Sequence, residues 1–264
     1  MNYFDTFAPT VKSASLRMVF SIALDNDLPM SQWDIETAFL IPSLPETEII
    51  YVEPPPWTNT PTHLVWRLLK ALYGIKQAAH LFYRHLKTTM AEISLFPSSS
   101  DPCIFVSKGP SIEIAAVHVD DIVLVASPSR TKTIKDFLET KYKMTGGGLP
   151  SWVLGIEVVF WKKSLQLTQR TFIQQILKKF NMEDCHPQAT PAAMDRLTSD
   201  MSPSDDKEKA QMEKVPYRQL LGSLMYVATQ TRPDISFAVG QAARRLDLDL
   251  LRLAGRFVLR RSCG

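Results

Sequence analysis

The sequence predicts a mixed α+β fold. Two observations lead to this prediction: residues 75–94 repeat apolar side chains at helical spacing, and residues 112–126 place two apolar strands around a polar turn. Helical and strand segments follow one another without a regular strand–helix–strand rhythm, which favours α+β over a parallel α/β sheet. The 264 residues, 45% of them hydrophobic, are enough for a sizeable core in one or two domains.

Each element is predicted from its local pattern. Apolar residues three and four apart indicate helices, and short runs rich in β-branched and aromatic residues indicate strands. Thr168 is expected to cap the helix that follows it. The expected helices are 13–25, 75–94, 131–142, one from after Thr168 to Phe180, 216–229 and 234–259. The expected strands are part of 30–40, 48–53, the hairpin over 112–126, 151–160 and 164–168.

Proline and glycine mark the breaks between these elements. Three prolines at 54–56 stop the strand over 48–53, because proline cannot donate to a strand ladder. The glycines at 146–148 and Pro150 are expected to break the chain. Residues 183–214 are polar, contain three prolines, and are interpreted as a loop or linker.

Composition excludes several classes of protein. No apolar run approaches the roughly 18 residues that a membrane span needs, and the first ten residues lack the basic and apolar regions of a secretory signal. The three cysteines, Cys103, Cys185 and Cys263, are odd in number and far apart, which fits reduced thiols rather than a disulfide framework or a metal site. We therefore expect an intracellular protein, cytoplasmic or nuclear, that does not engage a membrane.

The net charge of +3 hides an uneven distribution. Residues 1–129 hold 8 basic and 13 acidic side chains, whereas residues 130–180 hold 10 basic and 3 acidic. On charge alone, the basic block is interpreted as solvated helix faces.

Three aspartates are the first sign of chemistry. Asp120 and Asp121 lie between the two apolar strands of the hairpin, where they are either a polar turn or a site for a divalent cation. Asp34, with Glu36 two residues on, is either an exposed acid at a strand end or a third ligand. An aspartate at a strand end and two in a distant turn can converge on a pair of metal ions that promote phosphoryl displacement.

Eight segments, in order, resemble the reverse transcriptase of copia-type LTR retrotransposons, from about Tyr3 to about Val239. They read FDTFAPTVKSASLR, QWDIETAFL, EIIYVEPPPW, VWRLLKALYGIKQA, DPCIFV, HVDDIVLVAS, WVLGIEV and YRQLLGSLMYVATQTRPDISFAV. The resemblance implies a right-handed polymerase fold. Residues 1–182 would hold partial fingers, the palm with its primer grip and the start of the thumb, 183–215 a polar linker, and 216–264 a helical connection region with an aberrant end.

The same resemblance implies an RNA-directed DNA polymerase. Asp34, Asp120 and Asp121 match the family's catalytic carboxylates, which bind two Mg²⁺ ions, with Mn²⁺ as an alternative. The implied partners are an RNA or DNA template with its primer and deoxynucleoside triphosphates.

Five further residues match positions that contact the nucleotide in this family. Phe39 would lie beneath the sugar and exclude a 2′-hydroxyl; its alternative interpretation is a core aromatic. Tyr73, Gly74, Lys76 and Gln77 would lie by the templating base and the incoming nucleotide; alternatively they begin the first, solvated turn of the following helix.

Residues after the hairpin match parts of the family that hold nucleic acid. Trp152, Leu154 and Gly155 resemble the primer grip, or else form a buried strand with a glycine bulge. Side chains of the basic block are candidates for contacts with the nucleic-acid backbone or else are solvated. These are Lys141, Lys143, Arg170, Lys178 and Lys179.

The chain departs from the family pattern in four places. The basic fingers segment that resembles K-A-R-L-V-A-K-G is absent, and the stretch after RPDISFAV does not continue the pattern, so a piece truncated at both ends is expected. His118 stands where the family has Tyr, and Ala79 where it has Pro. The alternative to an active polymerase is therefore an inactive remnant, either binding nucleic acid or without function; an unrelated metal-dependent nuclease explains fewer of the motifs.

Overall fold

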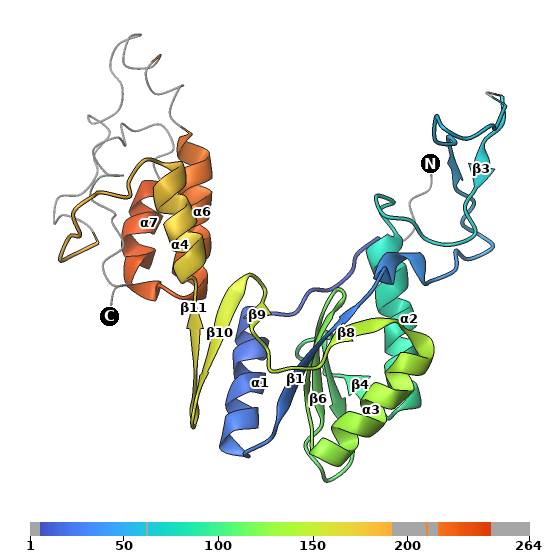
Figure 1. Ribbon diagram of the computed structural model, residues 1–264, viewed down its shortest axis with the longest axis horizontal. Helices are drawn as coiled ribbons and strands as arrows, with labels where there is room; N and C mark the ends of the chain where they lie inside the picture. Colours follow the sequence, from blue (N-terminus) through green and yellow to red (C-terminus); the bar gives the residue numbers. More distant parts are fainter. Residues whose placement is uncertain (1–5, 62, 192–209, 211–215, 244–264) are drawn as a thin grey trace. The chain divides into compact units, whose positions relative to one another are not determined.

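The computed structural model describes residues 6–61, 63–191, 210 and 216–243 (Figure 1). These residues form an α+β fold, as predicted. The chain divides into two compact units, Met1–Leu154 and Gly155–Gly264, called unit 1 and unit 2 below. Among the described residues, no helix is long and apolar enough to cross a membrane.

Unit 1 is built on a six-stranded antiparallel sheet with the order β4-β5-β6-β7-β1-β8. β6 and β7 form the expected hairpin, and β1 lies between β7 and β8. The elements of unit 1 are α1 (Ser13–Asp25), β1 (Met30–Ile35), the 3-10 helix η1 (Ala38–Leu40), β2 (Tyr51–Val52), β3 (Trp66–Arg67), α2 (Ala78–Glu92), β4 (Leu95–Pro97), β5 (Ile104–Ser107), β6 (Ile114–His118), β7 (Asp121–Val125), α3 (Pro128–Lys141), β8 (Met144–Gly146) and β9 (Trp152–Val153).

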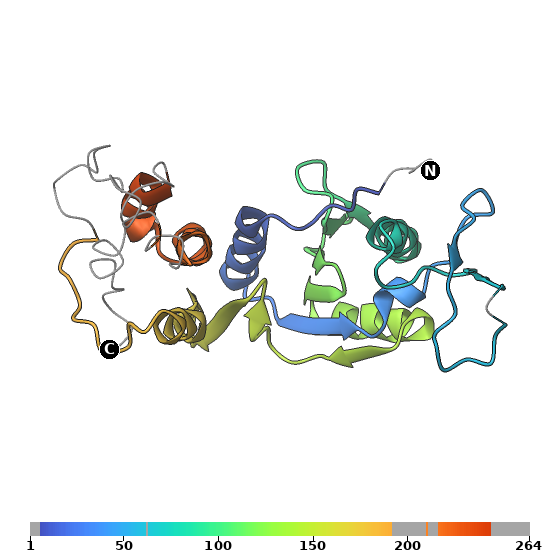
Figure 2. The same cartoon turned by 90° about the horizontal axis from the view of Figure 1, so that it is seen from above.

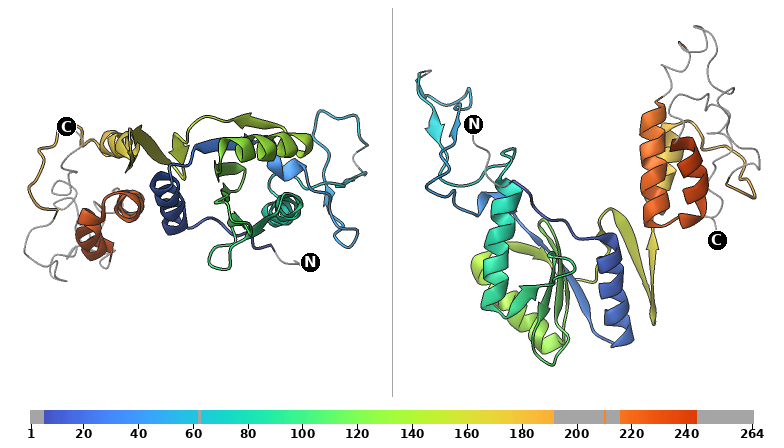
Figure 3. Two further views of the ribbon diagram at one scale, coloured as in Figure 1. Left: turned by 90° about the horizontal axis from the view of Figure 1, so that it is seen from below. Right: turned by 180° about the vertical axis from the view of Figure 1, so that it is seen from behind.

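Helices cover the sheet of unit 1 from two sides. α2 and α3 pack on one face, where Phe82, Leu86 and Ile134 join the main hydrophobic core. α1 lies on the other side and contacts β6 (Figure 1, Figure 3). Apolar contacts with helices thus anchor both faces of the sheet.

Strand alternation decides which side chains of β1 enter the core. Trp33 and Ile35 are buried against α2 and α3. Because successive side chains of a strand point to opposite faces, Gln32 and Asp34 lie on the other face of the sheet. Both are only partly buried.

The break expected at the glycines 146–148 and Pro150 is present, since Gly147, Gly148 and Pro150 lie outside any helix or strand. Gly146 itself still belongs to the edge strand β8 and pairs with Trp33 of β1. Gly146 and Gly147 have φ of +102° and +100°; a Cβ on Gly146 would lie 2.6 Å from the Gln32 carbonyl oxygen, and one on Gly147 would overlap the Trp33 ring. Glycine is required here because the edge strand approaches β1 too closely for a side chain.

Other boundaries also differ from the prediction. The helix expected over 75–94 begins only at Ala78, because Gly74 has φ of +96° and residues 76–77 form a turn. The strand expected over 48–53 covers only β2. The pattern also missed β3, β4 and β5, whose two to four residues are too few for alternation to stand out.

Unit 2 combines a hairpin with helices. β10 (Ile156–Trp161) pairs with β11 (Ser164–Thr168), and then follow α4 (Arg170–Lys179), α6 (Tyr217–Gln230), the 3-10 helix η3 (Pro233–Ile235) and α7 (Ser236–Ala243). One core joins α4, α6, η3 and α7 (Figure 1, Figure 2). The N-cap of α4 is Gln169 rather than Thr168, although the Thr168 hydroxyl accepts a hydrogen bond from the Arg170 N–H at 3.3 Å.

The end of the predicted last helix and most of the predicted linker lie outside the described residues. α7 ends at Ala243, where the description of the chain stops. Of the expected linker over 183–215, only residues 183–191 and 210 are described.

Asp101 connects the segment before α1 to the loop before β5. Its residue is 2% exposed, and its carboxylate accepts hydrogen bonds from the N–H groups of Lys12 (2.9 Å) and Cys103 (3.0 Å). Burial opposes ionisation, but these bonds and one from the Ser15 hydroxyl hold the pKa of Asp101 below its ordinary value. The folded state therefore favours the charged carboxylate.

We expect Asp101→Asn to lower the free energy of unfolding by about 1–3 kcal/mol, because an amide cannot accept both backbone hydrogen bonds as the carboxylate does. The pKa of Asp101 is lower in the folded state. Its contribution is therefore complete above the ordinary pKa of 3.8 and is lost as the pH falls through the lower folded-state pKa. Urea unfolding at pH 7 and pH 3 measures both effects. The exposed Asp136→Asn is the control, and equal stability of the two variants at pH 7 would contradict the account.

Candidate active site

Three aspartates from distant parts of the sequence meet at one end of the central strands of unit 1. Asp34 in β1 is paired with Asp121, the first residue of β7. Asp120 lies in the turn between β6 and β7, and its carbonyl oxygen accepts a hydrogen bond from the Ile35 N–H at 3.0 Å. The fold therefore brings together the three carboxylates that the sequence singled out.

The charges of this cluster repel one another. Burial raises the pKa of Asp34 above its ordinary value, and the neighbouring carboxylates of Asp120, Asp121 and Glu36 raise it further. A bound cation reverses this situation, because it compensates the negative charges that make ionisation costly. The electrostatics thus fit a site that holds a divalent cation.

The donor set also suits magnesium. Carboxylate oxygens are the ligands that Mg²⁺ prefers, and proteins usually hold it with one or two carboxylates, water and substrate phosphates. Among the described residues, no three acidic, histidine or cysteine side chains are grouped so that they could hold a metal ion. Asp34, Asp120 and Asp121 thus supply the ligand type that Mg²⁺ prefers, but their side chains do not form a ready-made metal site.

Gln32 is a residue of this site that the sequence reasoning missed. Its Nε2 donates to a carboxylate oxygen of Asp121 at 3.2 Å and to the carbonyl oxygen of Trp152 at 2.8 Å. Its Oε1 accepts from the Ser151 N–H at 3.3 Å. Gln32 stands two residues before Asp34 on the same face of β1, a spacing that could have drawn attention to it. One side chain thus links the aspartate cluster to Ser151 and to Trp152, the first residue of β9.

The hairpin turn beside the cluster has an unusual backbone. Val119 has φ of +59°, which β-branched residues rarely adopt, so the turn stores strain next to Asp120. His118 pairs with Asp121 across the hairpin, and its buried Nδ1 has no hydrogen-bond partner. His118, which stands where the family has Tyr, is therefore next to the aspartates.

Phe39 follows the aspartate cluster and is half buried. Its ring lies 5.1 Å from the ring of Tyr73 and 6.4 Å from that of Phe82, measured between centroids. It also packs against the main core and against a small cluster that includes Ala71. These contacts agree with the interpretation of Phe39 as a core aromatic, and its position beneath a sugar stays a prediction.

The other predicted nucleotide contacts lie in the loop before α2. Tyr73 is 52% exposed and touches Phe39, and Gly74 adopts a positive φ of +96°. Lys76 is exposed, and Gln77 stands at the N-cap of α2 without a side-chain capping bond. The structure brings Tyr73 to Phe39, and the roles of Lys76 and Gln77 at the nucleotide stay predictions.

The predicted primer-grip residues flank the point in the sequence where unit 1 ends and unit 2 begins. Trp152 is 44% exposed, while its carbonyl oxygen is held by Gln32. Leu154 and Gly155 have φ of +55° and +71°, the sign that the central residues of a type I′ turn require. This differs from a glycine bulge within one continuous strand. A Cβ on Gly155 would lie 2.7 Å from the Tyr226 hydroxyl oxygen, so a side chain here would require the end of the Tyr226 side chain to shift.

The predicted backbone contacts divide into two ion-paired lysines of unit 1, both exposed, and three cations of α4 in unit 2. Lys141 forms an ion pair with Glu92 at 2.9 Å, and Lys143 with Glu36 at 2.6 Å. In unit 2, the exposed residues Arg170, Lys178 and Lys179 all lie on α4. Lys178 and Lys179 stand in its last turn, where they also complement the helix dipole.

Comparisons with known proteins find similar sequences over nearly the whole chain. A family model described as reverse transcriptase (RNA-dependent DNA polymerase) matches residues 1–194. The chain is 34% identical over 255 residues to the retrovirus-related Pol polyprotein from transposon TNT 1-94 of Nicotiana tabacum, covering 94% of this chain and 19% of that protein. It is also 34% identical over 249 residues to the polyprotein from transposon RE1 of Arabidopsis thaliana, covering 92% and 16%. The chain thus spans less than a fifth of the length of these relatives.

The positive φ of Leu154 predicts a reversal of the usual preference for alanine over glycine. Alanine is normally the more stabilising residue, but a left-handed position penalises any Cβ by about 1–2 kcal/mol. We expect Leu154→Gly to be more stable than Leu154→Ala by about 1 kcal/mol. The same two substitutions at exposed Leu149, which has no positive φ, are the control and should favour alanine. Thermal unfolding measures the differences, and the same order at both positions would rule out the strain.

Proposed function

The chain belongs to the reverse transcriptases of copia-type retrotransposons, and from this premise we propose that it acts as an RNA-directed DNA polymerase domain of a Pol polyprotein. The observation that carries the proposal is the register of β1 and β7, which sets Asp34 opposite Asp121 with Asp120 in the adjoining turn. Three carboxylates at one end of a sheet suit a two-metal nucleotidyl transfer.

We assign the polymerase regions to the two units as follows. Unit 1 corresponds to the palm with part of the fingers, and the segment from Trp152 to Gly155 to the primer grip. The hairpin and α4 of unit 2 begin the thumb, and residues 216–264 form the connection region. The assignment is supported by the sheet of unit 1, since α2 and α3 cover one face and Asp34 lies on the other.

In the proposed reaction the primer 3′-oxygen bonds to the α-phosphorus of a deoxynucleoside triphosphate while the bond to pyrophosphate breaks. Two Mg²⁺ ions, or Mn²⁺ in their place, would supply the positive charge that activates the 3′-hydroxyl and neutralises the leaving group. Asp34 and Asp120 would be the firmest ligands, and Asp121 would complete the pair. Gln32 orients Asp121 through its 3.2 Å hydrogen bond and holds the Trp152 backbone near the same carboxylate.

The substrates follow from the surrounding residues. Phe39, backed by Tyr73 and Phe82, offers a rigid ring that would exclude a 2′-hydroxyl and so select deoxynucleotides. An RNA or DNA template with its primer is the proposed partner, and its phosphates would contact the exposed cations of α4. Lys141 and Lys143 are weaker candidates for this role, because each already pairs with a carboxylate.

The first test is Mg²⁺-dependent primer extension on an RNA template. We expect Asp120→Asn to slow extension by about 1,000-fold or more, since losing a metal ligand removes several kcal/mol of transition-state stabilisation. Asp136→Asn, on the exposed side of α3, should extend like the wild type. Wild-type extension no faster than that of Asp120→Asn would refute the polymerase. Salt-sensitive duplex binding without extension would then support a nucleic-acid-binding remnant.

The second test concerns the choice of sugar. We expect Phe39→Val to raise the rate with a ribonucleotide relative to the matching deoxynucleotide by about 10-fold or more, because the smaller side chain leaves space for the 2′-hydroxyl. The control is Phe105→Val, which alters a fully buried ring in β5. A ratio of rates does not depend on the folded fraction of each variant. If both variants keep the wild-type ratio, Phe39 is only a core aromatic.

A further inference from the structure

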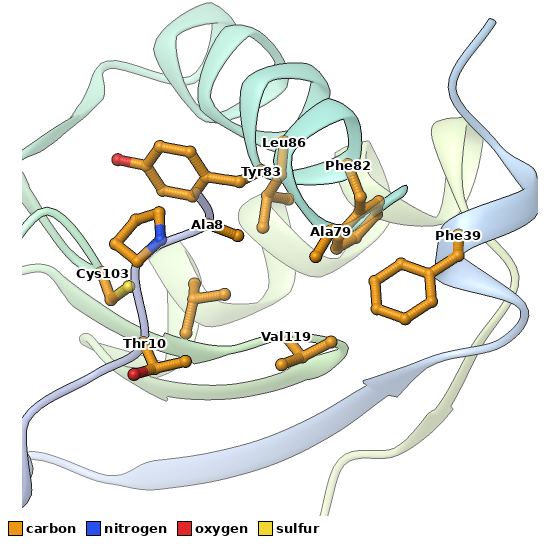
Figure 4. A pocket seen from close by; sticks show the side chains of 11 residues that line it. Ala8, Thr10, Phe39, Ala79, Phe82, Tyr83, Leu86, Cys103 and Val119 are labelled. Carbon is orange, nitrogen blue, oxygen red and sulfur yellow. The ribbon is translucent and has the colours of Figure 1, made fainter. Parts of the chain in front are cut away.

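A cavity that is partly open to solvent lies behind the candidate active site in unit 1. Its volume is about 130 Å³, and it lies between the segment 8–10, the helix α2 and the strand β6 (Figure 4). Val117, which belongs to the core on the α2 face of the sheet, forms part of its floor. Because Gln32 and Asp34 lie on the opposite face, this cavity is separate from the aspartate cluster.

The lining of the cavity is apolar and carries no charged side chain. Ala79, Phe82 and Leu86 line it from α2, and Phe39 closes one end (Figure 4). The Tyr83 hydroxyl donates a hydrogen bond to the Pro102 carbonyl oxygen at 3.1 Å. Tyr83 therefore offers its apolar ring, and not an unpaired hydroxyl, to a molecule in the cavity. Burial raises the pKa of the Cys103 thiol to about 12, which keeps this lining group neutral. Such a lining disfavours the binding of ions.

The size of the cavity selects its ligand. An apolar cavity of about 150 Å³ stays dry and binds benzene, and this one is only slightly smaller. Aromatic rings at Phe39, Phe82 and Tyr83 favour a planar aromatic guest, because edge-to-face contacts add to the burial of apolar surface. A carboxylate or ammonium on the ligand would be buried without a partner.

Two lining residues connect the cavity to the candidate site. Val119, with its strained φ of +59°, directly precedes Asp120. Phe39 is the residue assigned above to the sugar. A molecule in the cavity would therefore contact the back of the turn that carries Asp120 and the ring of Phe39.

We propose that this cavity binds an uncharged aromatic molecule about the size of benzene, which packs against Phe39 and Val119 from the α2 side of the sheet. Binding is measured here without catalysis, so its outcome is independent of the polymerase assignment.

The experiment uses the full chain with benzene as the probe and benzoate as its charged counterpart. At ten times its Kd, benzene should raise the Tm of the wild type by about 3–6 °C. It should also shift the methyl resonances of Val117 and Val119, while those of Val227 in unit 2 stay unchanged. Benzoate should do neither, because its charge cannot be buried there.

Two matched variants locate the binding. Ala79→Leu fills the cavity and should abolish the effects of benzene, whereas Ala91→Leu makes the same change on the exposed side of α2 and should preserve them. If Ala79→Leu does not fold, Leu86→Ala tests the same point by enlarging the cavity, and benzene should then bind several-fold more tightly. The proposal is overturned if benzene does not bind the wild type, if Ala79→Leu binds it as tightly, or if Leu86→Ala gains no affinity.

Discussion

The pairing of β1 with β7 is the constraint on which the rest of unit 1 depends. Its register sets Asp34 opposite Asp121 and, on alternate residues, sends Trp33 and Ile35 into the core. A slip by one residue would bury the aspartate and expose the tryptophan. The burial of large apolar side chains, each stabilising by about 1.5–3 kcal/mol, therefore fixes the position of a carboxylate cluster that is itself repulsive.

Close approach on the other side of β1 completes this arrangement. Gly146 and Gly147 let the edge strand pass against the Gln32 carbonyl and the Trp33 ring. The chain then returns past Ser151 and Trp152, which Gln32 holds together with Asp121. The candidate primer grip is thus tied to the aspartates in two ways. Gly146 and Gly147 allow the close backbone approach, and the Gln32 amide supplies the hydrogen bonds.

The sequence predicted the parts that depend on long or strongly patterned segments. α1, α3 and the β6–β7 hairpin follow from apolar periodicity, and the three aspartates stood out because charge inside apolar strands conflicts with strand propensity. The close approach at the glycines 146–147 could not be predicted, because glycine occurs both at breaks between elements and where two backbones approach closely. The sequence alone does not distinguish the two cases. Gln32 and the apolar cavity depend on contacts between residues far apart in the chain, which no local pattern contains.

The most direct measurement of the central claim is a titration of Mn²⁺ into the isotopically labelled full chain with a template–primer bound. A paramagnetic ion broadens the resonances of nearby nuclei. If Asp34, Asp120 and Asp121 hold the ion, the signals of their neighbours Ile35 and Ile122 should broaden first, while those of Val227 in unit 2 stay sharp. The Asp34→Asn and Asp120→Asn variants should lose this selective broadening. Broadening centred elsewhere, or unchanged in these variants, would contradict the assignment of the metal site.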